Sequence, residues 1–92
     1  MTKIRVKTII WDGWNIEHIK KHSVSIRETE EAGGNIIYHR KTDKNRYLAV
    51  GRSKHRMITI IIRRLESTTY FLVSARDASK KERKTAYEKE LS

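Results

Sequence analysis

The stretch RMITIIIR, residues 56–63, decides the fold of this chain. Three isoleucines at every second position, Ile58, Ile60 and Ile62, point to one side of an extended chain, because successive side chains in a strand face opposite sides. Ile61 makes the other side partly apolar as well. A strand with apolar residues on both sides belongs inside a sheet. We therefore expect residues 56–63 to form the central strand.

Further strands are predicted before and after this segment. Runs rich in β-branched and aromatic residues cover 35–41, 46–51 and 68–75, and short turn-like segments separate them. Short connections favour antiparallel pairing of strands that follow one another. We therefore expect these strands to form an antiparallel meander with the central one. The first ten residues, in which apolar and basic side chains alternate, predict a fifth strand.

Capping signals predict two helices in the first third of the chain. Asp12 can cap a helix over 13–22, because its carboxylate accepts hydrogen bonds from the exposed N–H groups of the first turn. Ser25 and Glu28 have the spacing of a capping box, in which each side chain bonds the backbone N–H of the other residue. The glycine pair at 33–34 ends this second helix, since glycine tolerates the backbone conformation that follows a helix.

The capping-box spacing recurs at Ser79 and Glu82 and predicts a charged final helix that ends near Glu90. The order of elements is then β-α-α-β-β-β-β-α. We predict an α+β fold, in which an antiparallel sheet of four to five strands has two N-terminal helices and one C-terminal helix. One face of the sheet must be covered, and the helices are available to do so.

Composition limits the classes of protein to which the chain can belong. Its 92 residues suffice for one domain, 1–92, and are too few for two separate cores. Without cysteine there is no disulfide framework and no cysteine zinc site. No apolar run approaches the roughly 18 residues of a membrane-spanning helix, and the first residues lack the continuous apolar centre of a signal peptide. We therefore expect a cytoplasmic location.

Positive charge dominates the chain and is concentrated in its middle third. Lysine and arginine number 21 against 11 aspartate and glutamate residues, which gives a formal net charge of +10. Residues 36–65 hold nine basic side chains and one acidic side chain. A solvated surface needs charge, but it does not need charge of one sign. This asymmetry favours a polyanionic partner, either nucleic acid or an anionic membrane surface.

Two arginines, Arg52 and Arg76, directly follow predicted strands. Strand ends from an antiparallel sheet can converge on one edge. Two guanidinium groups there could clamp one phosphate, because their planar donor forks match its oxygens. Two simpler alternatives remain open. Arg76 could pair with Asp77 or Glu66, and Arg52 could simply be exposed to solvent.

Proton transfer has three candidates, His39, His55 and Tyr87. Histidine titrates near neutral pH and can act as acid or base, and tyrosine can serve where cationic neighbours lower its pKa. Each candidate also has a structural alternative. His39 could be a solvent-facing strand residue, His55 a turn residue, and Tyr87 a packing anchor for the final helix.

Trp11, Trp14, His18 and His22 lie in or beside the first predicted helix. The histidines have the four-residue spacing of zinc ligands, but no third ligand is evident. A stripe of Trp14, His18 and His22 that packs partly against the sheet is the simpler interpretation. The tryptophans could stack on nucleic-acid bases, although in so small a domain a core or interface role is commoner.

Five segments of the chain, in their order and separation, resemble the pattern of BrnT-family toxins. They are residues 11–12, HIKKHSVSI at 18–26, residues 51–53, residues 74–78 and residues 80–83, and together they extend over about residues 10–88. Two positions differ from the pattern. This chain has Ser23 where the family has glycine, and it has one extra residue before Tyr87. One extra residue turns a helical side chain by about 100°.

The resemblance implies a RelE-like fold and the toxin half of a type II toxin–antitoxin system. Such toxins are endoribonucleases that use no metal or other cofactor. The 2′-OH of RNA attacks the adjacent phosphate, and cleavage inhibits translation and growth. A BrnA-like antitoxin with a DNA-binding domain neutralises the toxin, and operator DNA is bound only through that complex.

On this basis we predict that Arg52 and Arg76 stabilise the phosphate and the transition state, because preorganised cations usually contribute most to such catalysis. His55, His39 and Tyr87 are the candidate acids and bases. The residues expected to hold the RNA backbone are Arg46, Arg56, Arg63, Arg64, Lys80 and Lys81. Two rival functions also fit the charge: a non-catalytic basic RNA- or DNA-binding module, and a basic subunit that mainly binds the antitoxin.

Overall fold

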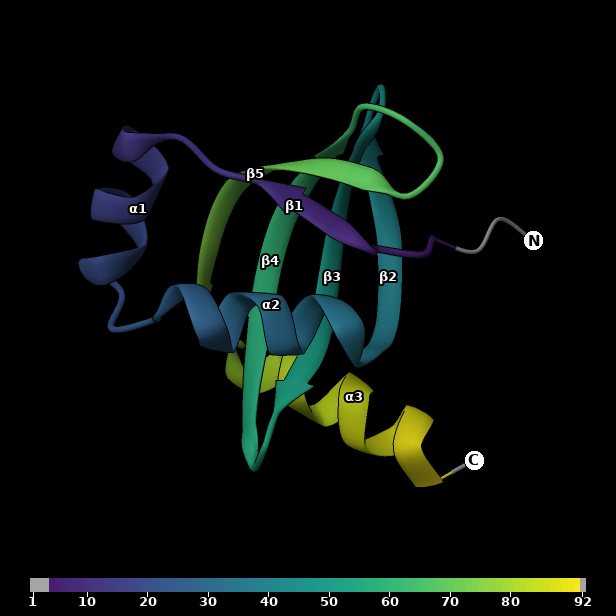
Figure 1. Ribbon diagram of the computed structural model, residues 1–92. Helices are drawn as coiled ribbons and strands as arrows, with labels where there is room; N and C mark the ends of the chain where they lie inside the picture. The colour runs from purple at the N-terminus through teal and green to yellow at the C-terminus, as the bar shows by residue number, and fades with distance from the viewer. Residues whose placement is uncertain (1–3, 92) are drawn as a thin grey trace.

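The computed structural model describes residues 4–91, which form the predicted order of elements (Figure 1). The strands are β1 (Thr8–Ile10), β2 (Ile36–Asp43), β3 (Arg46–Ser53), β4 (Arg56–Arg64) and β5 (Thr69–Asp77). The helices are α1 (Gly13–Lys20), α2 (Ile26–Gly34) and α3 (Lys80–Leu91). The α+β class is confirmed. The first strand is shorter than predicted, and positions 1–3 of that prediction lie outside the described residues.

β4 is the central strand of a five-stranded sheet with the order β1-β5-β4-β3-β2. The four later strands pair antiparallel, as predicted. The sheet is mixed, however, because β1 runs parallel to β5, with Thr8 opposite Thr69. A tight turn makes consecutive strands antiparallel, whereas β1 and β5 are far apart in the chain and their relative direction is not fixed by any turn. The sequence therefore predicted the meander but not the direction of this edge strand.

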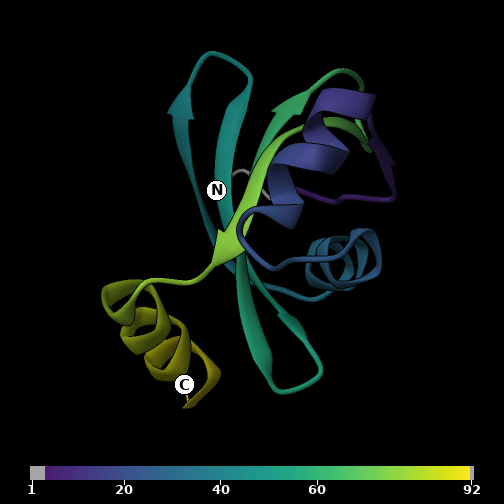
Figure 2. The same cartoon turned by 90° about the vertical axis from the view of Figure 1, so that its left-hand side faces the viewer.

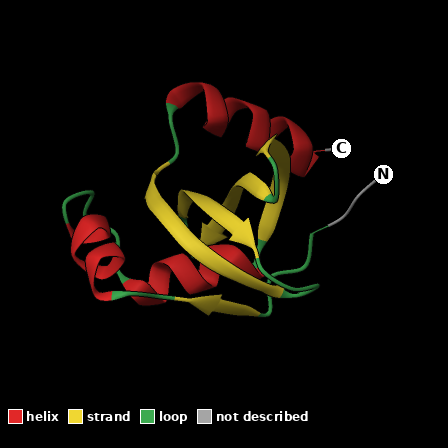
Figure 3. Cartoon of the chain, turned by 90° about the horizontal axis from the view of Figure 1, so that it is seen from above, coloured by secondary structure: helices red, strands yellow, loops and turns green. Residues whose placement is uncertain are grey.

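The helices cover both faces of the sheet, one face more than the prediction required. α1 and α2 lie on one side of the sheet and α3 lies on the other (Figure 2, Figure 3). The first side holds the larger core, which includes the fully buried Ile58, Ile60 and Ile62 of β4. On the second side α3 contributes Ala86, its buried residue, to a smaller apolar cluster. Polar contacts must therefore help to hold α3 in place.

The predicted helix caps are present at all three helix starts. The pairs are Asp12 with Asn15, Ser25 with Glu28, and Ser79 with Glu82. In the last two pairs, each side chain accepts a hydrogen bond from the backbone N–H of the other residue, as in a capping box. Within residues 4–91, no helix has both the length and the apolar character needed to cross a lipid bilayer.

Gly51 allows α2 to approach β3 closely. A Cβ atom at this position would collide with the carbonyl oxygen of Ala32 in α2. Next to it, the backbone N–H of Arg52 donates to the carbonyl of Asn35, which follows α2, at 3.1 Å. This packing fixes the end of β3, from which the side chain of Arg52 extends toward the opposite face of the sheet.

Candidate active site

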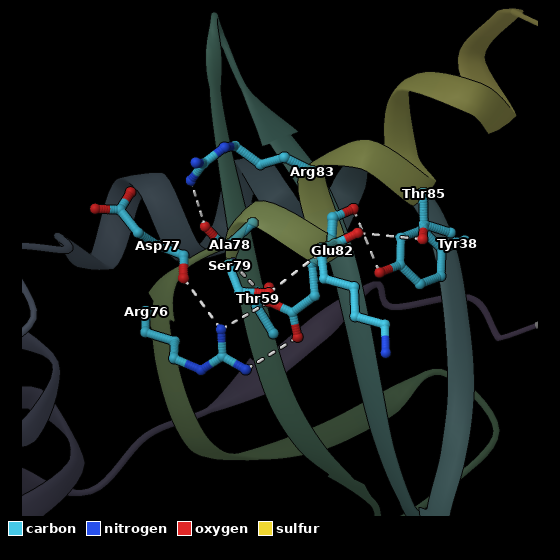
Figure 4. A network of polar contacts seen from close by, with 10 residues as sticks. Tyr38, Thr59, Arg76, Asp77, Ala78, Ser79, Glu82, Arg83 and Thr85 are labelled. Atoms are coloured by element: carbon cyan, nitrogen blue, oxygen red, sulfur yellow. Dashed lines mark hydrogen bonds and ion pairs between the residues drawn. The ribbon is translucent and has the colours of Figure 1, made fainter.

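Arg76 of β5 is bound by the first turn of α3 (Figure 4). Its Nη1 and Nη2 atoms donate to the two carboxylate oxygens of Glu82 at 2.7 and 3.0 Å. Nη1 also donates to the backbone carbonyl of Asp77 at 3.1 Å. The sequence suggested Asp77 or Glu66 as the alternative acidic partner, whereas the observed partner is Glu82. The guanidinium group is thus fixed by a two-point contact near the end of β5.

Glu82 is charged at neutral pH. Besides Arg76, its Oε1 accepts hydrogen bonds from the hydroxyl of Thr59 and from the backbone N–H of Ser79, both at 2.8 Å. The hydrogen bonds from Arg76, above all, lower the pKa of Glu82 to about 2. A carboxylate with so low a pKa is a poor proton acceptor. Glu82 therefore positions Arg76 rather than accepting a proton itself.

A pocket of about 400 Å³ opens beside Glu82, between α3 and the sheet. Tyr38 and Arg40 of β2 line it, together with Lys81 of α3. The Tyr38 hydroxyl lies 3.5 Å from the carbonyl oxygen of Glu82, on the side away from Arg76 (Figure 4). Burial, above all, raises the pKa of Tyr38, and the charge of Glu82 adds to this effect. The hydroxyl therefore stays protonated at neutral pH and can act as a proton donor.

Neither Tyr38 nor Arg40 was predicted as a site residue. The signal for them is the alternation along β2, in which Tyr38 is opposite Val50 and Arg40 is opposite Leu48. Val50 and Leu48 belong to the apolar cluster under α3. Alternation therefore places Tyr38 and Arg40 on the face of the sheet that α3 covers. This can be recognised only once the position of that helix is known.

The same alternation turns His39 to the other face of the sheet. His39 is opposite Ala49, which belongs to the larger core, and its ring lies 6.2 Å from that of Tyr47. The structure therefore does not bring His39 to Arg52 or Arg76.

Arg52 forms a second cluster at the far end of α3. Its Nε and Nη2 atoms donate to the carboxylate oxygens of Glu90, both at 2.9 Å. Nη1 donates to the backbone carbonyl of His55 at 2.9 Å, and the guanidinium group lies 5.6 Å from the centroid of the Tyr87 ring. The structure thus brings Arg52 together with the ring of Tyr87 and with the backbone of His55, and it pairs Arg52 with an acid that the sequence did not indicate.

The two arginines share one face and one end of the sheet. Arg52 is opposite Met57, and Arg76 is opposite Thr59, two positions further along β4. With strands ~4.8 Å apart and ~3.4 Å per residue, their Cα atoms are about 12 Å apart. Each guanidinium group binds a different glutamate of α3, so while these ion pairs are formed the two do not surround a common point. Both arginines also lie inside their strands, whereas the prediction placed them just beyond the strand ends.

Three of the six basic residues predicted to hold RNA, Arg46, Arg63 and Arg64, lie apart from these clusters. Arg46 and Arg63 are opposite each other on β3 and β4, and Arg63 lies 5.3 Å from the centroid of the Phe71 ring. Arg64 donates to the backbone carbonyl of Glu66 at 3.4 Å. Lys80 and Lys81 are exposed in the first turn of α3.

Arg56 connects several segments of the protein. It donates to Asp77 at the end of β5, to Glu28 of α2 and to the carbonyl of Ser23, each at 2.8 Å. The hydrogen bonds from Arg56 lower the pKa values of Asp77 and Glu28. An RNA phosphate would therefore compete with two carboxylates for the charge of Arg56.

The fold of this chain is similar to that of a protein of known structure. No protein-family model matches the chain, and no curated protein matches it. The crystal structure of the Brucella abortus ribonuclease toxin BrnT is similar over 85% of this chain and 100% of the toxin chain, with a TM-score of 0.62 and 22% sequence identity. This chain has a BrnT-like fold. At this level of identity the likeness concerns the fold, so the roles of individual residues depend on the site itself.

The backbone angle of Ser23 shows why glycine is expected at this position in the BrnT pattern. Ser23 adopts a φ of 57°, in the left-handed region that glycine enters without crowding of a Cβ atom. Glycine is therefore the residue that suits this turn. The same turn ends α1 at Lys20, two residues earlier than predicted. The extra residue before Tyr87 does not separate its ring from Arg52, although Tyr87 is 51% exposed.

Trp11 and Trp14 have different surroundings in the BrnT-like fold. Trp11 is partly buried against the larger core, in agreement with the structural interpretation. Trp14 is 68% exposed and stacks on His18, so the predicted stripe is present but faces solvent rather than the sheet. Throughout residues 4–91, no three histidine or acidic side chains are grouped in a way that could hold a metal ion.

Proposed function

We propose that this chain is the toxin of a type II toxin–antitoxin system and acts as a metal-independent endoribonuclease. The observation that carries the proposal is the placement of Arg52 and Arg76 on one face and at one end of the sheet. The fold adds support, since a solved protein with the same arrangement is described as a ribonuclease toxin. A net charge of +10 suits a polyanionic substrate.

RNA carries its own nucleophile for this reaction. The 2′-oxygen forms a bond to the adjacent phosphorus and the bond to the 5′-oxygen breaks, which leaves a 2′,3′-cyclic phosphate and a 5′-hydroxyl. A base accepts the proton of the 2′-OH, and an acid protonates the leaving 5′-oxygen. The protein must align these groups and stabilise the negative charge that develops on the phosphorane.

In this proposal, Arg76 and Arg52 stabilise the negative charge of the phosphorane. Each guanidinium group already binds a carboxylate at two points, and a phosphate offers oxygens in a similar geometry. The pair of Arg52 and Glu90 is the easier one for a phosphate to open. Its side chains are 26% and 33% exposed, and such ion pairs contribute little in water. Glu82 is 15% exposed and has further hydrogen bonds. A phosphate therefore replaces Glu90 at Arg52 first.

Proton transfer is assigned to groups on the same face. Tyr38 and Tyr87 each lie close to one arginine cluster, and either hydroxyl can protonate the leaving 5′-oxygen. The exposed ring of His55 follows Arg52 closely in the chain and is the candidate to accept the 2′-OH proton. His39 faces the other side of the sheet, and we assign it no step.

The remaining parts of the proposal concern partners and location. Arg40, Arg46 and Arg63 extend the basic face on the α3 side of the sheet and would hold the RNA backbone. A BrnA-like antitoxin with a DNA-binding domain would neutralise the toxin, and operator DNA would be bound only through their complex. The toxin would act in the cytoplasm, where RNA cleavage inhibits translation.

Controlled expression with and without the neighbour-encoded partner tests this function. Expression alone is expected to arrest growth and to produce new RNA fragments with 5′-hydroxyl ends, and the partner is expected to abolish both effects. Cleavage by the purified protein should continue in EDTA. Growth arrest without new RNA ends would contradict the ribonuclease assignment, and loss of cleavage in EDTA would contradict metal independence.

One observation favours a second candidate, a non-catalytic RNA- or DNA-binding module. Both central arginines are bound to carboxylates of α3, whereas a binding surface needs only the basic residues around them. Such a module would bind RNA with steep salt dependence and form no product. Product formation by the purified chain therefore decides between the two candidates.

A further inference from the structure

Trp14, His18 and His22 form a ladder of rings along the exposed side of α1. The rings of Trp14 and His18 are stacked, with centroids 4.8 Å apart and an angle of 13° between their planes, and the His22 ring meets that of His18 edge-on at 5.2 Å. Trp14 nevertheless remains 68% exposed. Burial of so large a ring is strongly favourable. The ladder is therefore suited to a partner that covers aromatic faces.

The helix that carries the ladder is held firmly against the rest of the protein. Asp12 caps it through the backbone N–H of Asn15 at 2.8 Å. The Asn15 side chain donates to the carbonyl of Leu72 in β5, and Ile19 is 1% exposed in the larger core. The rings thus have a set orientation before any partner binds, which reduces the entropic cost of binding.

An unpaired nucleic-acid base has the chemistry that this surface fits. Bases of any sequence can stack on aromatic side chains. Lys21 has helical backbone angles and follows Trp14 by seven residues, so it lies on the same side of the helix and supplies a cation for the backbone. The neighbouring acid, Glu17, is paired with Lys20 at 3.2 Å. The local charge and the net charge of +10 both favour a polyanion.

The ladder leads toward the proposed catalytic site. Arg56 donates to the carbonyl of Ser23, next to His22, and also to Asp77, which directly follows Arg76. β1 pairs only with the first three residues of β5. α1 therefore lies beside the remainder of β5, up to the end that carries Arg76 (Figure 1). A strand of RNA that left Arg76 around this edge would meet the end of α1 next to His22 before the end that carries Trp14.

We propose that Trp14 and His18 form a stacking platform for an unpaired base of the RNA substrate, a few nucleotides from the phosphate bound at the site of Arg52 and Arg76. The inference rests on the proposed function for the identity of the polymer. The binding it describes does not depend on cleavage, so the two can be tested apart.

The test uses a 2′-O-methyl single-stranded oligonucleotide of about ten nucleotides, which is within the usual site sizes for single-strand binding and lacks the nucleophilic hydroxyl. In Trp11→Phe protein, Trp14 is the sole indole, and its fluorescence should be quenched on binding. Trp14→Ala should weaken binding about 5- to 100-fold, while Trp14→Phe should keep most of the affinity.

Salt dependence separates stacking from charge contacts. Stacking releases no counterions, so Trp14→Ala should leave the slope of log K against log salt unchanged, whereas Lys21→Ala should reduce it by about 0.7. The duplex of the same sequence, in which bases are not available to stack, should bind Trp14→Ala as it binds the parent protein.

Two results would overturn the proposal. The first is parental affinity of Trp14→Ala for the single strand, and the second is an equal loss on the duplex. If the first result comes with loss of neutralisation by the co-expressed partner, the ladder is a protein-binding surface.

Failure of the ribonuclease assignment would look different. The purified chain would then form no product from a cleavable RNA, whereas the loss of oligonucleotide binding in Trp14→Ala would remain. If both proposals hold, Trp14→Ala should raise KM for cleavable RNA with little change in kcat, because stacking supports ground state and transition state alike.

Discussion

At position 51, the absence of a side chain determines where Arg52 can lie. The carbonyl oxygen of Ala32 occupies the space that a Cβ atom of Gly51 would need. Gly51→Ala should therefore lower the free energy of unfolding by about 1–3 kcal/mol, measured by urea denaturation. The control is Gly34→Ala, at a site with nothing within 4 Å of the added atom. Equal stability of the two variants would contradict the close approach of α2 and β3.

Ser23 offers a second prediction at the same scale. Its φ of 57° disfavours residues with a Cβ atom by about 1–2 kcal/mol, and the extra freedom of glycine in the unfolded chain offsets about 0.5–1 kcal/mol of this. Ser23→Gly should therefore raise the free energy of unfolding by about 0.5–1 kcal/mol. Ser23→Val should lower it, since β-branched residues tolerate this conformation poorly. Thermal denaturation checks both, and a loss of stability on Ser23→Gly would contradict the account of this turn.

Among the elements, α3 has an unusual attachment, since ion pairs at both ends supplement its small apolar contact. Ala86 is buried, whereas Tyr87 and Leu91 are 51% and 88% exposed. The carboxylates of Glu82 and Glu90 bind the two arginines to which we assign phosphate binding. α3 therefore links the stability of the fold to the availability of the site.

Glu90→Gln should strengthen the binding of a non-cleavable RNA strand about two- to fivefold, because Arg52 loses its charged competitor. The matched control is Glu30→Gln, which removes the same charge from an exposed position of α2. Titration at constant salt gives the comparison. An equal gain in both variants would mean that net charge, rather than the release of Arg52, is responsible.

The pair of Arg76 and Glu82 should make stability depend on pH. The pKa of Glu82 is about 2 in the folded state and near 4.5 when unfolded, so its contribution is complete above pH 4.5 and is lost as the pH falls toward 2. At neutral pH, the free energy of unfolding of the parental protein should be about 2 kcal/mol higher than that of Glu82→Gln. Denaturation across this range should show the difference closing between pH 4.5 and 2. A constant difference would contradict the assignment.

For the molecule as a whole, local signals in the sequence predicted most of the fold. Alternation in β4, the capping boxes and the short turns each act over a few residues, and the structure follows them. The direction of β1 was not predictable, because it depends on pairing with a strand about sixty residues away. Those distant contacts are decided by the packing of the whole chain.

The candidate site was predicted less completely, for the same reason. The capping box with Ser79 accounted for Glu82, so nothing in the sequence pointed to its second contact, with Arg76. The pairing of Glu90 with Arg52 depends on how α3 lies on the sheet, and so does the contribution of Tyr38. The roles of Arg52 and Arg76 stay predictions; the sequence placed the two arginines just beyond predicted strands, whereas both lie in the last residues of β3 and β5.

The central claim is tested most directly by the rate at which the purified chain cleaves one RNA in EDTA. The rate is compared among four proteins: the parental protein, Arg52→Ala, Arg76→Ala and Arg27→Ala. Arg27 is an exposed arginine of α2, on the other side of the sheet, and controls for the loss of one positive charge. We expect Arg27→Ala to cleave like the parental protein, and Arg52→Ala and Arg76→Ala to lose at least about 100-fold in kcat. Cleavage by both of these variants at the parental rate would contradict the account.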